Sequence, residues 1–176
     1  DIIVPSAQLS VTKMNGERAT VRGLEVDFRT SFAFISPALG DLYLGGNAAW
    51  ISSKAILSEN IGIQGTENPR FQGQSPYVYN LQLMYDNPDT LWTATVLYNV
   101  SGPRITEYGA YSMPDTSREP FHRLDFVASK TLKERLKISM KFQNILGSRT
   151  ESVVGDAVVD SIQRGRALSL GVGLTF

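Results

Sequence analysis

Within the last twelve residues, Gly165 to Phe176, the chain alternates without a fault from Ala167 onward between small or weakly polar and large apolar side chains. A period of two predicts a β-strand with one apolar face and one small, uncharged face. The strands of a soluble sandwich usually carry well-solvated side chains on the outer face. An uncharged second face and a terminal aromatic residue are instead typical of a transmembrane β-barrel. The large apolar positions are Leu168, Leu170, Val172, Leu174 and Phe176.

The same alternation recurs along the chain and predicts about eight antiparallel, up-and-down strands. Asn15 and Gly16 form a tight-hairpin signal after the first of them. Aromatic residues stand at the ends of the apolar rows, and charged residues are confined to the opposite face. Both features favour a membrane barrel over a soluble sandwich. The other predicted strands cover residues 7–14, 18–34, 42–51, 77–85, 92–99, 123–129 and 136–143.

The connections between these segments alternate between short and long. Short turns are predicted at 36–41, 86–90 and 130–135, and long loops at 57–75, 100–120 and 147–163. Outer-membrane barrels have short periplasmic turns and longer extracellular loops. We therefore expect the short turns and both chain ends in the periplasm, and the three long loops outside the cell.

Composition excludes several classes of function. Lys plus Arg and Asp plus Glu both number 17, so no nucleic-acid partner is expected. The chain has no cysteine and one histidine, His122, so we expect no cofactor and no metal site. A set of Ser117, His122 and Asp125 lacks the Gly-x-Ser-x-Gly turn that would support hydrolytic chemistry. We therefore do not expect an enzyme.

Charged residues within the strands fall opposite the apolar rows. Lysines at every second position cannot face hydrocarbon, so this face is predicted to line the barrel lumen. The close spacing of Glu25, Asp27 and Arg29 predicts a ladder of salt bridges. Two tyrosines of the second long loop, Tyr108 and Tyr111, are candidates for ligand contact. The predicted lumen-facing charged residues are Glu25, Asp27, Arg29, Arg123, Asp125, Lys137 and Lys141.

Four segments together resemble the C-terminal part of the β-barrel of TonB-dependent outer-membrane receptors. They are residues 19–28 (ATVRGLEVDF), 80–104, 123–148 and the terminal LGVGLTF. The family's Gly-x-Glu, Asn-Ile/Leu-Leu and terminal Phe motifs occur in the same order at Gly23 to Glu25, Asn144 to Leu146 and Phe176.

The resemblance implies that residues 1–176 are the last third of a barrel of about 22 strands with a plugged lumen. The plug domain and the N-terminal segment that contacts the energy-coupling protein TonB are not in these residues. Such a receptor, in the bacterial outer membrane, binds a scarce siderophore, cobalamin, glycan or peptide at its extracellular loops and imports it. The implied partners are membrane lipid, the upstream strands, the plug, TonB and the barrel assembly machinery. That machinery would recognise an assembly signal formed by Leu170, Val172, Leu174 and Phe176.

A complete small barrel of the OmpA or OmpX type, structural or adhesive and without transport, is the alternative. About eight strands also suffice for such a protein, which must fill its interior with side chains. Ser139, Ser169 and Gly171 would leave that interior underfilled, although charged residues could pair across a narrow core. The interior and the family resemblance together favour part of a larger barrel.

Overall fold

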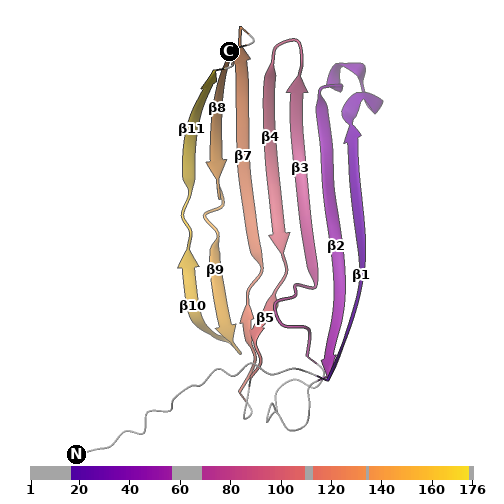
Figure 1. The fold of residues 1–176 in the computed structure, drawn as a ribbon, viewed down its shortest axis with the longest axis vertical. Coiled ribbons are helices and arrows are strands. Elements are labelled where there is room, and N and C mark those ends of the chain that lie inside the picture. The colour runs from indigo at the N-terminus through magenta and orange to yellow at the C-terminus, as the bar shows by residue number, and fades with distance from the viewer. Residues whose placement is uncertain (1–16, 57–68, 110–112, 134, 175–176) are drawn as a thin grey trace, which may run out of the picture.

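The computed structural model describes residues 17–56, 69–109, 113–133 and 135–174. In these residues the protein is all-β, and every strand pair is antiparallel (Figure 1). The elements are β1 (Arg18–Ser31), η1 (Phe32–Phe34), η2 (Pro37–Leu39), β2 (Leu42–Ile56), β3 (Tyr77–Asn87), β4 (Trp92–Ser101), β5 (Arg104–Glu107), β6 (Thr116–Arg118), β7 (Phe121–Leu132), β8 (Leu136–Gln143), β9 (Arg149–Val154), β10 (Ala157–Gln163) and β11 (Ala167–Leu174).

Seven strands form the main sheet, in the order β1-β2-β3-β4-β7-β8-β11. They lie side by side in Figure 1, with the short turns at the upper end of the view. Each coincides with a segment that alternates in the sequence, so the prediction of an all-β, antiparallel, up-and-down arrangement is confirmed. The predicted strand at 7–14 lies outside the described residues. No helix in the described ranges has the length and apolar character needed to cross a membrane.

A second sheet, in the order β10-β9-β6-β5, extends the main sheet at its lower end in Figure 1. Ser101 pairs with Phe121, and three residues further along both strands Arg104 pairs with Arg118, so the register does not slip. Pro103 and Pro120 lie between these pairs, and proline has no N–H to donate to a ladder. The prediction of loops at 100–120 and 147–163 was therefore wrong, because both segments carry paired strands.

Residues 69–76 join the two sheets. The amide of Ala55 donates to the carbonyl of Pro69 at 2.9 Å, and the amide of Gly73 donates to the carbonyl of Ile105 at 2.7 Å. This segment therefore lies between β2 and β5 as a backbone-bonded link. Of the loop predicted at 57–75, residues 57–68 lie outside the described residues.

The short-turn end differs from the prediction in detail. β1 ends at Ser31, before the predicted end near Phe34, because η1 begins there. The Ser31 hydroxyl accepts a hydrogen bond from the Ala33 amide at 3.0 Å and donates one to the Gly40 carbonyl at 3.1 Å. Such side-chain bonds to the backbone compete with a strand ladder and favour a turn. β3 and β7 also extend into the predicted turns at 86–90 and 130–135.

The register divides the side chains of the main sheet between two faces. Paired residues of adjacent antiparallel strands share a face. The apolar face carries Leu24, Val26, Phe28, Leu44, Trp50, Tyr79, Leu81, Leu83, Tyr85, Ala94, Val96, Tyr98, Leu124, Phe126, Ile138, Met140, Phe142, Leu168, Leu170, Val172 and Leu174. The polar face carries Glu25, Asp27, Arg29, Asn47, Asn80, Gln82, Thr93, Thr95, Asn99, Arg123, Asp125, Ser129, Lys137, Ser139, Lys141, Ser169 and Gly171.

The described residues contain almost no hydrophobic core. Only Ala55 and Val100 are apolar and buried, at 6% and 5% exposure, and no large side chain is fully buried. β1 and β11 are the edges of an open sheet, because neither has a second neighbour among the described strands. The described strands therefore do not close into a barrel.

Candidate functional site

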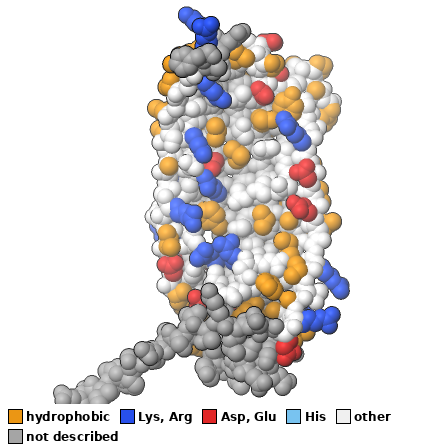
Figure 2. Space-filling model, in the orientation of Figure 1, with side chains coloured by type: hydrophobic (Ala, Val, Ile, Leu, Met, Phe, Trp, Pro, Cys, Tyr) orange, Lys and Arg blue, Asp and Glu red, His pale blue; other side chains and the backbone are white. Residues whose placement is uncertain are grey.

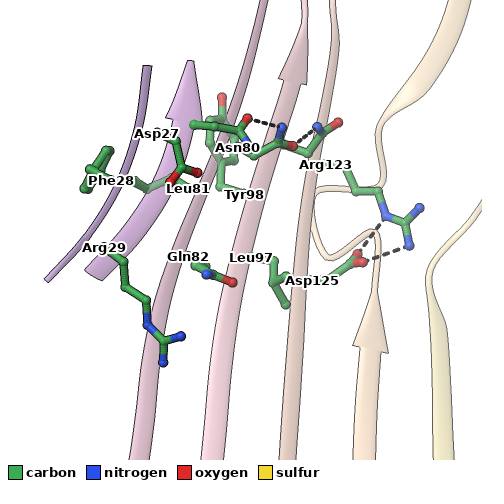
Figure 3. A pocket seen from close by; sticks show the side chains of 13 residues that line it. Asp27, Phe28, Arg29, Asn80, Leu81, Gln82, Leu97, Tyr98, Arg123 and Asp125 are labelled. Carbon is green, nitrogen blue, oxygen red and sulfur yellow. Dashed lines mark hydrogen bonds and ion pairs between the residues drawn. The ribbon is translucent and has the colours of Figure 1, made fainter. Parts of the chain in front are cut away.

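A row of polar side chains crosses the polar face from β1 to β7. The register aligns Asp27, Asn47, Asn80, Asn99 and Arg123, one from each of five adjacent strands. The Asn80 amide nitrogen donates to the Asn47 side-chain oxygen at 2.7 Å, and that of Asn99 donates to the Asn80 side-chain oxygen (Figure 3). We call Asn47, Asn80 and Asn99 the amide row.

The amide row is polarised. Both hydrogen bonds run in the same direction, so the NH₂ groups of Asn80 and Asn99 point toward β1 and the accepting oxygens point toward β7. The positive end of the aligned dipoles is thus nearest the Asp27 carboxylate, and the negative end is nearest the Arg123 guanidinium. Aligned hydrogen bonds of this kind reinforce one another.

Arg123 and Asp125 form a two-point ion pair beside this row (Figure 3). Arg123 Nε donates to Asp125 Oδ1 at 2.9 Å, and Nη2 lies 2.8 Å from Oδ2. Asp125 Oδ1 also accepts the backbone amide of Asn144 at 2.9 Å. Two parallel charge-assisted bonds fix the orientation of both side chains.

Asn144 in turn holds the junction between the main sheet and the β9–β10 hairpin. Its φ is 51°, in the left-handed region that asparagine tolerates better than most residues. Its side-chain nitrogen donates to the Gly165 carbonyl at 2.7 Å, and its oxygen accepts the Ser148 amide at 3.0 Å. The ion pair and this junction therefore form one connected network.

The amide row and the Arg123–Asp125 ion pair line a hollow of about 510 Å³ in the polar face. Charged side chains of both signs are spread along the face seen in Figure 2. The charged residues that were predicted to face the lumen share the polar face, including Lys137 and Lys141 on β8. Their exposure to a lumen stays a prediction.

The predicted salt-bridge ladder of Glu25, Asp27 and Arg29 is wrong. Within the described ranges the one ion pair is that of Arg123 and Asp125. Arg29 instead lies over the ring of Tyr43, with its Cζ 5.4 Å from the ring centre. Alternate residues on one strand can pair, as Arg123 and Asp125 do, but the Arg29 side chain turns to the neighbouring strand instead.

His122 and Asp125 lie on opposite faces of β7. Successive side chains of a strand alternate between its faces, and these two positions are three steps apart. His122 Nδ1 is 2.7 Å from the Tyr98 hydroxyl on the apolar face. The set of Ser117, His122 and Asp125 is therefore not assembled. No cluster of three metal-ligating residues occurs in the parts of the chain that the structure describes.

The Tyr108 side chain holds the backbone of residues 70–72. Its hydroxyl accepts the Gln72 amide at 3.0 Å and donates to the Arg70 carbonyl at 2.9 Å. Burial raises the pKa of the Tyr108 hydroxyl, and the nearby charge of Asp115 adds to this, against the opposing effect of the bond from Gln72. The hydroxyl proposed for ligand contact thus holds residues 70–72. Tyr111 lies outside the described residues.

Aromatic residues border the apolar face at both ends. Near the long connections Tyr79 stacks on Tyr77 at 5.2 Å and meets Trp50 edge-on at 5.6 Å. Near the short turns Trp92 contacts Lys130, whose Nζ lies 5.2 Å from the ring centre. Leu81 and Leu83 lie between these borders, on β3.

The strand that carries the predicted assembly signal, β11, is an edge strand. Leu170 and Val172 are 75% and 74% exposed, and Leu174 is also exposed. Their apolar row and the unpaired backbone edge lie together on one strand. Phe176 lies outside the described residues.

The amide row is the feature that the sequence analysis missed. Asparagine is depleted in strands, so three asparagines inside alternating segments were a usable signal. The row becomes visible only when the register aligns them.

Neither the family models nor the curated proteins nor the solved structures that were compared with the chain gave a match.

Proposed function

We propose that the chain is part of the β-barrel of a TonB-dependent outer-membrane receptor, with its apolar face in lipid and its polar face toward a plugged lumen. One observation carries the proposal. The sheet has a continuous apolar face, bordered by aromatic residues and almost without a protein core, and its edges β1 and β11 have no second neighbour among the described strands. An exposed apolar surface of this extent marks an interaction surface.

The dimensions of the apolar face fit a bilayer. From Tyr77 to Tyr85 the strand β3 rises about 26 Å. Tilted by about 40°, it would span about 20 Å of an outer-membrane apolar band that is about 25 Å tall. Tyrosine and tryptophan are the residues enriched at both borders of such a band.

The free edges support part of a larger barrel over a complete small one. A closed barrel has no edges, and upstream strands would pair with β1 and β11. In this proposal loops beyond the long-connection end capture a siderophore, cobalamin, glycan or peptide, and TonB drives its release inward through the plug. The strand β11, through Leu170, Val172, Leu174 and Phe176, recruits the assembly machinery.

Refolding in detergent micelles tests the proposal. Residues 1–176 alone should remain heat-sensitive and show no shift between folded and unfolded bands on a gel. The full-length protein should show that shift and should localise to the outer membrane. A stable, heat-shifting barrel from residues 1–176 alone would establish the small-barrel alternative instead.

Transport is tested separately, in cells. Uptake of candidate solutes by the full-length protein should disappear when TonB is deleted. Uptake that is independent of TonB would contradict the receptor assignment while leaving the membrane location intact.

A further inference from the structure

The apolar face changes character at one row of residues near the long connections. Trp50 pairs with Tyr77, and the Gly102 amide donates to the Tyr77 carbonyl at 2.9 Å, so these three residues form one row. Beyond it, on the same face of β1 and β2, stand Arg22 and Lys54. The face is thus apolar on one side of the row and basic on the other.

Two further arginines continue this pattern on β5 and β6. A Cβ on Gly102 would lie 2.8 Å from the Tyr77 ring, which places Gly102 on the apolar face. Arg104 follows two residues later, and the unbroken register pairs it with Arg118. Alternation therefore puts both arginines on this face, one step beyond the aromatic row. We call Arg22, Lys54, Arg104 and Arg118 the basic band.

The basic band has no anionic partner among the residues that the structure describes. Among the described residues none of its four side chains forms an ion pair or a hydrogen bond. Arg118 Nε is buried without an acceptor. Like charges directly opposite one another in a sheet are destabilising, so an anion would stabilise Arg104 and Arg118, and the described residues do not pair one with them.

The opposite end of the apolar face provides the contrast. Its cation, Lys130, donates to the Thr90 carbonyl at 2.6 Å and lies over the Trp92 ring. On the other face of the sheet the residues next to the basic band are Val21 and Ser53 on β1 and β2 and Ile105 and Ser117 on β5 and β6, with Glu119 beside Arg118 as the charged exception. Lys130 thus has partners within the protein that the cations of the basic band lack.

We propose that the basic band binds the phosphate groups of lipid headgroups in the membrane leaflet that surrounds the long-connection end. The inference rests on the proposed membrane location. An aromatic row marks the depth at which hydrocarbon meets headgroups. Residues two to four positions farther along, about 7–13 Å of strand, reach the headgroup layer. Arginine matches phosphate with parallel hydrogen bonds, which explains the choice of residue on β5 and β6.

Fluorescence quenching by brominated lipids tests the proposal in the full-length protein, reconstituted in phosphatidylcholine vesicles. The chain has two tryptophans, Trp50 and Trp92. The Trp92→Phe substitution, together with replacement of any tryptophan elsewhere in the full-length protein, leaves Trp50 beside the basic band as the reporter. Brominated phosphatidic acid should associate at Trp50 at least about fivefold more strongly than brominated phosphatidylcholine. A fivefold ratio is what a single cation gives at about 1 kcal/mol per cation.

Replacing the four residues by glutamine should bring that ratio close to one. Lys130→Gln is the matched control, and the ratio should not change. Equal quenching by both lipids in the parent, or a preference that survives the quadruple variant, would overturn the proposal. So would loss of the preference on adding inorganic phosphate, which would assign the site to free anions.

Two readouts separate folding and insertion from headgroup recognition. Quenching by brominated phosphatidylcholine should be the same in parent and variants, and its absence in the parent would contradict the membrane location itself. If the quadruple variant does not insert, the pairs Arg22→Gln/Lys54→Gln and Arg104→Gln/Arg118→Gln carry the test. Each pair should lose part of the preference, and no loss in either would overturn the proposal.

Discussion

The two faces of the main sheet find partners for their side chains in different places. On the polar face Asn80 bonds to both of its neighbours in the amide row, and Arg123 bonds to Asp125. On the apolar face Leu170 and Val172 stay about three-quarters exposed, and no second layer formed by the described residues covers them. The amide row and the Arg123–Asp125 pair thus find directed partners within the sheet, whereas Leu170 and Val172 find no apolar cover among the described residues.

This difference teaches why the chain forms an ordered sheet without a hydrophobic core. Backbone ladders and polar bonds specify the register of the strands. In the proposed membrane location, the hydrophobic contribution would come from lipid and from strands that pair with β1 and β11. It is about 25 cal/mol per Å² of apolar surface removed from water. The first three predictions each change one face and leave the other intact, and the last two concern the link between the sheets; all use the full-length protein.

A charge at the centre of the apolar face should have the largest effect. Val96 lies between Leu83 and Phe126 in the register. Val96→Lys should lower the free energy of unfolding in vesicles by about 3 kcal/mol, because an ammonium is costly at the bilayer midplane. Urea titration measures this. Thr95→Lys, one residue away on the polar face, is the control and should cost less than about 1 kcal/mol.

Removing the ion pair should have the next largest effect. Asp125→Ala leaves the Arg123 guanidinium and the Asn144 amide without their acceptor. We expect a loss of about 2 kcal/mol in the same titration, since bonds to charged groups contribute about 1.5–3 kcal/mol. Glu25→Ala removes a carboxylate of the same face that has no described ion pair. An equal loss in the two variants would show that the network does not stabilise the sheet.

The amide row should contribute less. Asn80→Ala removes both hydrogen bonds of the row, and we expect the free energy of unfolding to fall by about 1 kcal/mol. Gln82→Ala, two residues along the same strand and face, is the matched control with no described side-chain bond. If the two substitutions have the same effect, the row is an alignment of asparagines without energetic consequence.

The smallest effect should be local, at the link between the sheets. Tyr108→Phe removes the bonds to Gln72 and Arg70. Hydrogen exchange at the Gln72 amide should quicken several-fold at neutral pH, with less than about 1 kcal/mol of global destabilisation. Unchanged exchange would show that the hydroxyl does not hold the segment.

The same tyrosine predicts a pH dependence of the link. The pKa of Tyr108 is raised in the folded protein, mainly by burial. Its contribution is therefore fully present below the ordinary tyrosine pKa of about 10 and is lost as the pH rises through the raised value. Difference absorbance between the parent and Tyr108→Phe gives the titration, and a midpoint below the ordinary value would contradict the burial.

The sequence was sufficient to predict the strands of the main sheet and the residues that share each face. Period-two alternation is a strong signal, as β11 illustrates with Leu170 and Val172 against Ser169 and Gly171. It could not predict β5 and β6, because Pro103 and Pro120 interrupt the ladder and also resemble loop signals. It could not predict β9 and β10, because Gly147, Gly155 and Gly165 punctuate that segment as turn residues do. The prolines break the hydrogen bonds without changing the register.

The candidate site was predictable only in part, for a related reason. Charged residues such as Asp27 and Arg123 were recognised one strand at a time. Their alignment through the amide row depends on register between strands, which local patterns do not specify. Likewise, spacing along one strand suggested pairing of Asp27 with Arg29, whereas Arg29 finds Tyr43 on the neighbouring strand.

The central claim is that the apolar face meets lipid and the polar face meets water, and β4 tests it most directly. The chain has no cysteine, so, with any cysteine elsewhere in the full-length protein replaced, spin labels can be attached at single cysteines placed at each position from 93 to 99. In reconstituted protein, collision with oxygen should peak at 94, 96 and 98, and collision with a water-soluble nickel complex at 93, 95, 97 and 99. Leu97 is the most informative position, because its side chain is apolar yet lies on the polar face. A lipid-exposed label at Leu97, or no alternation along β4, would contradict the account.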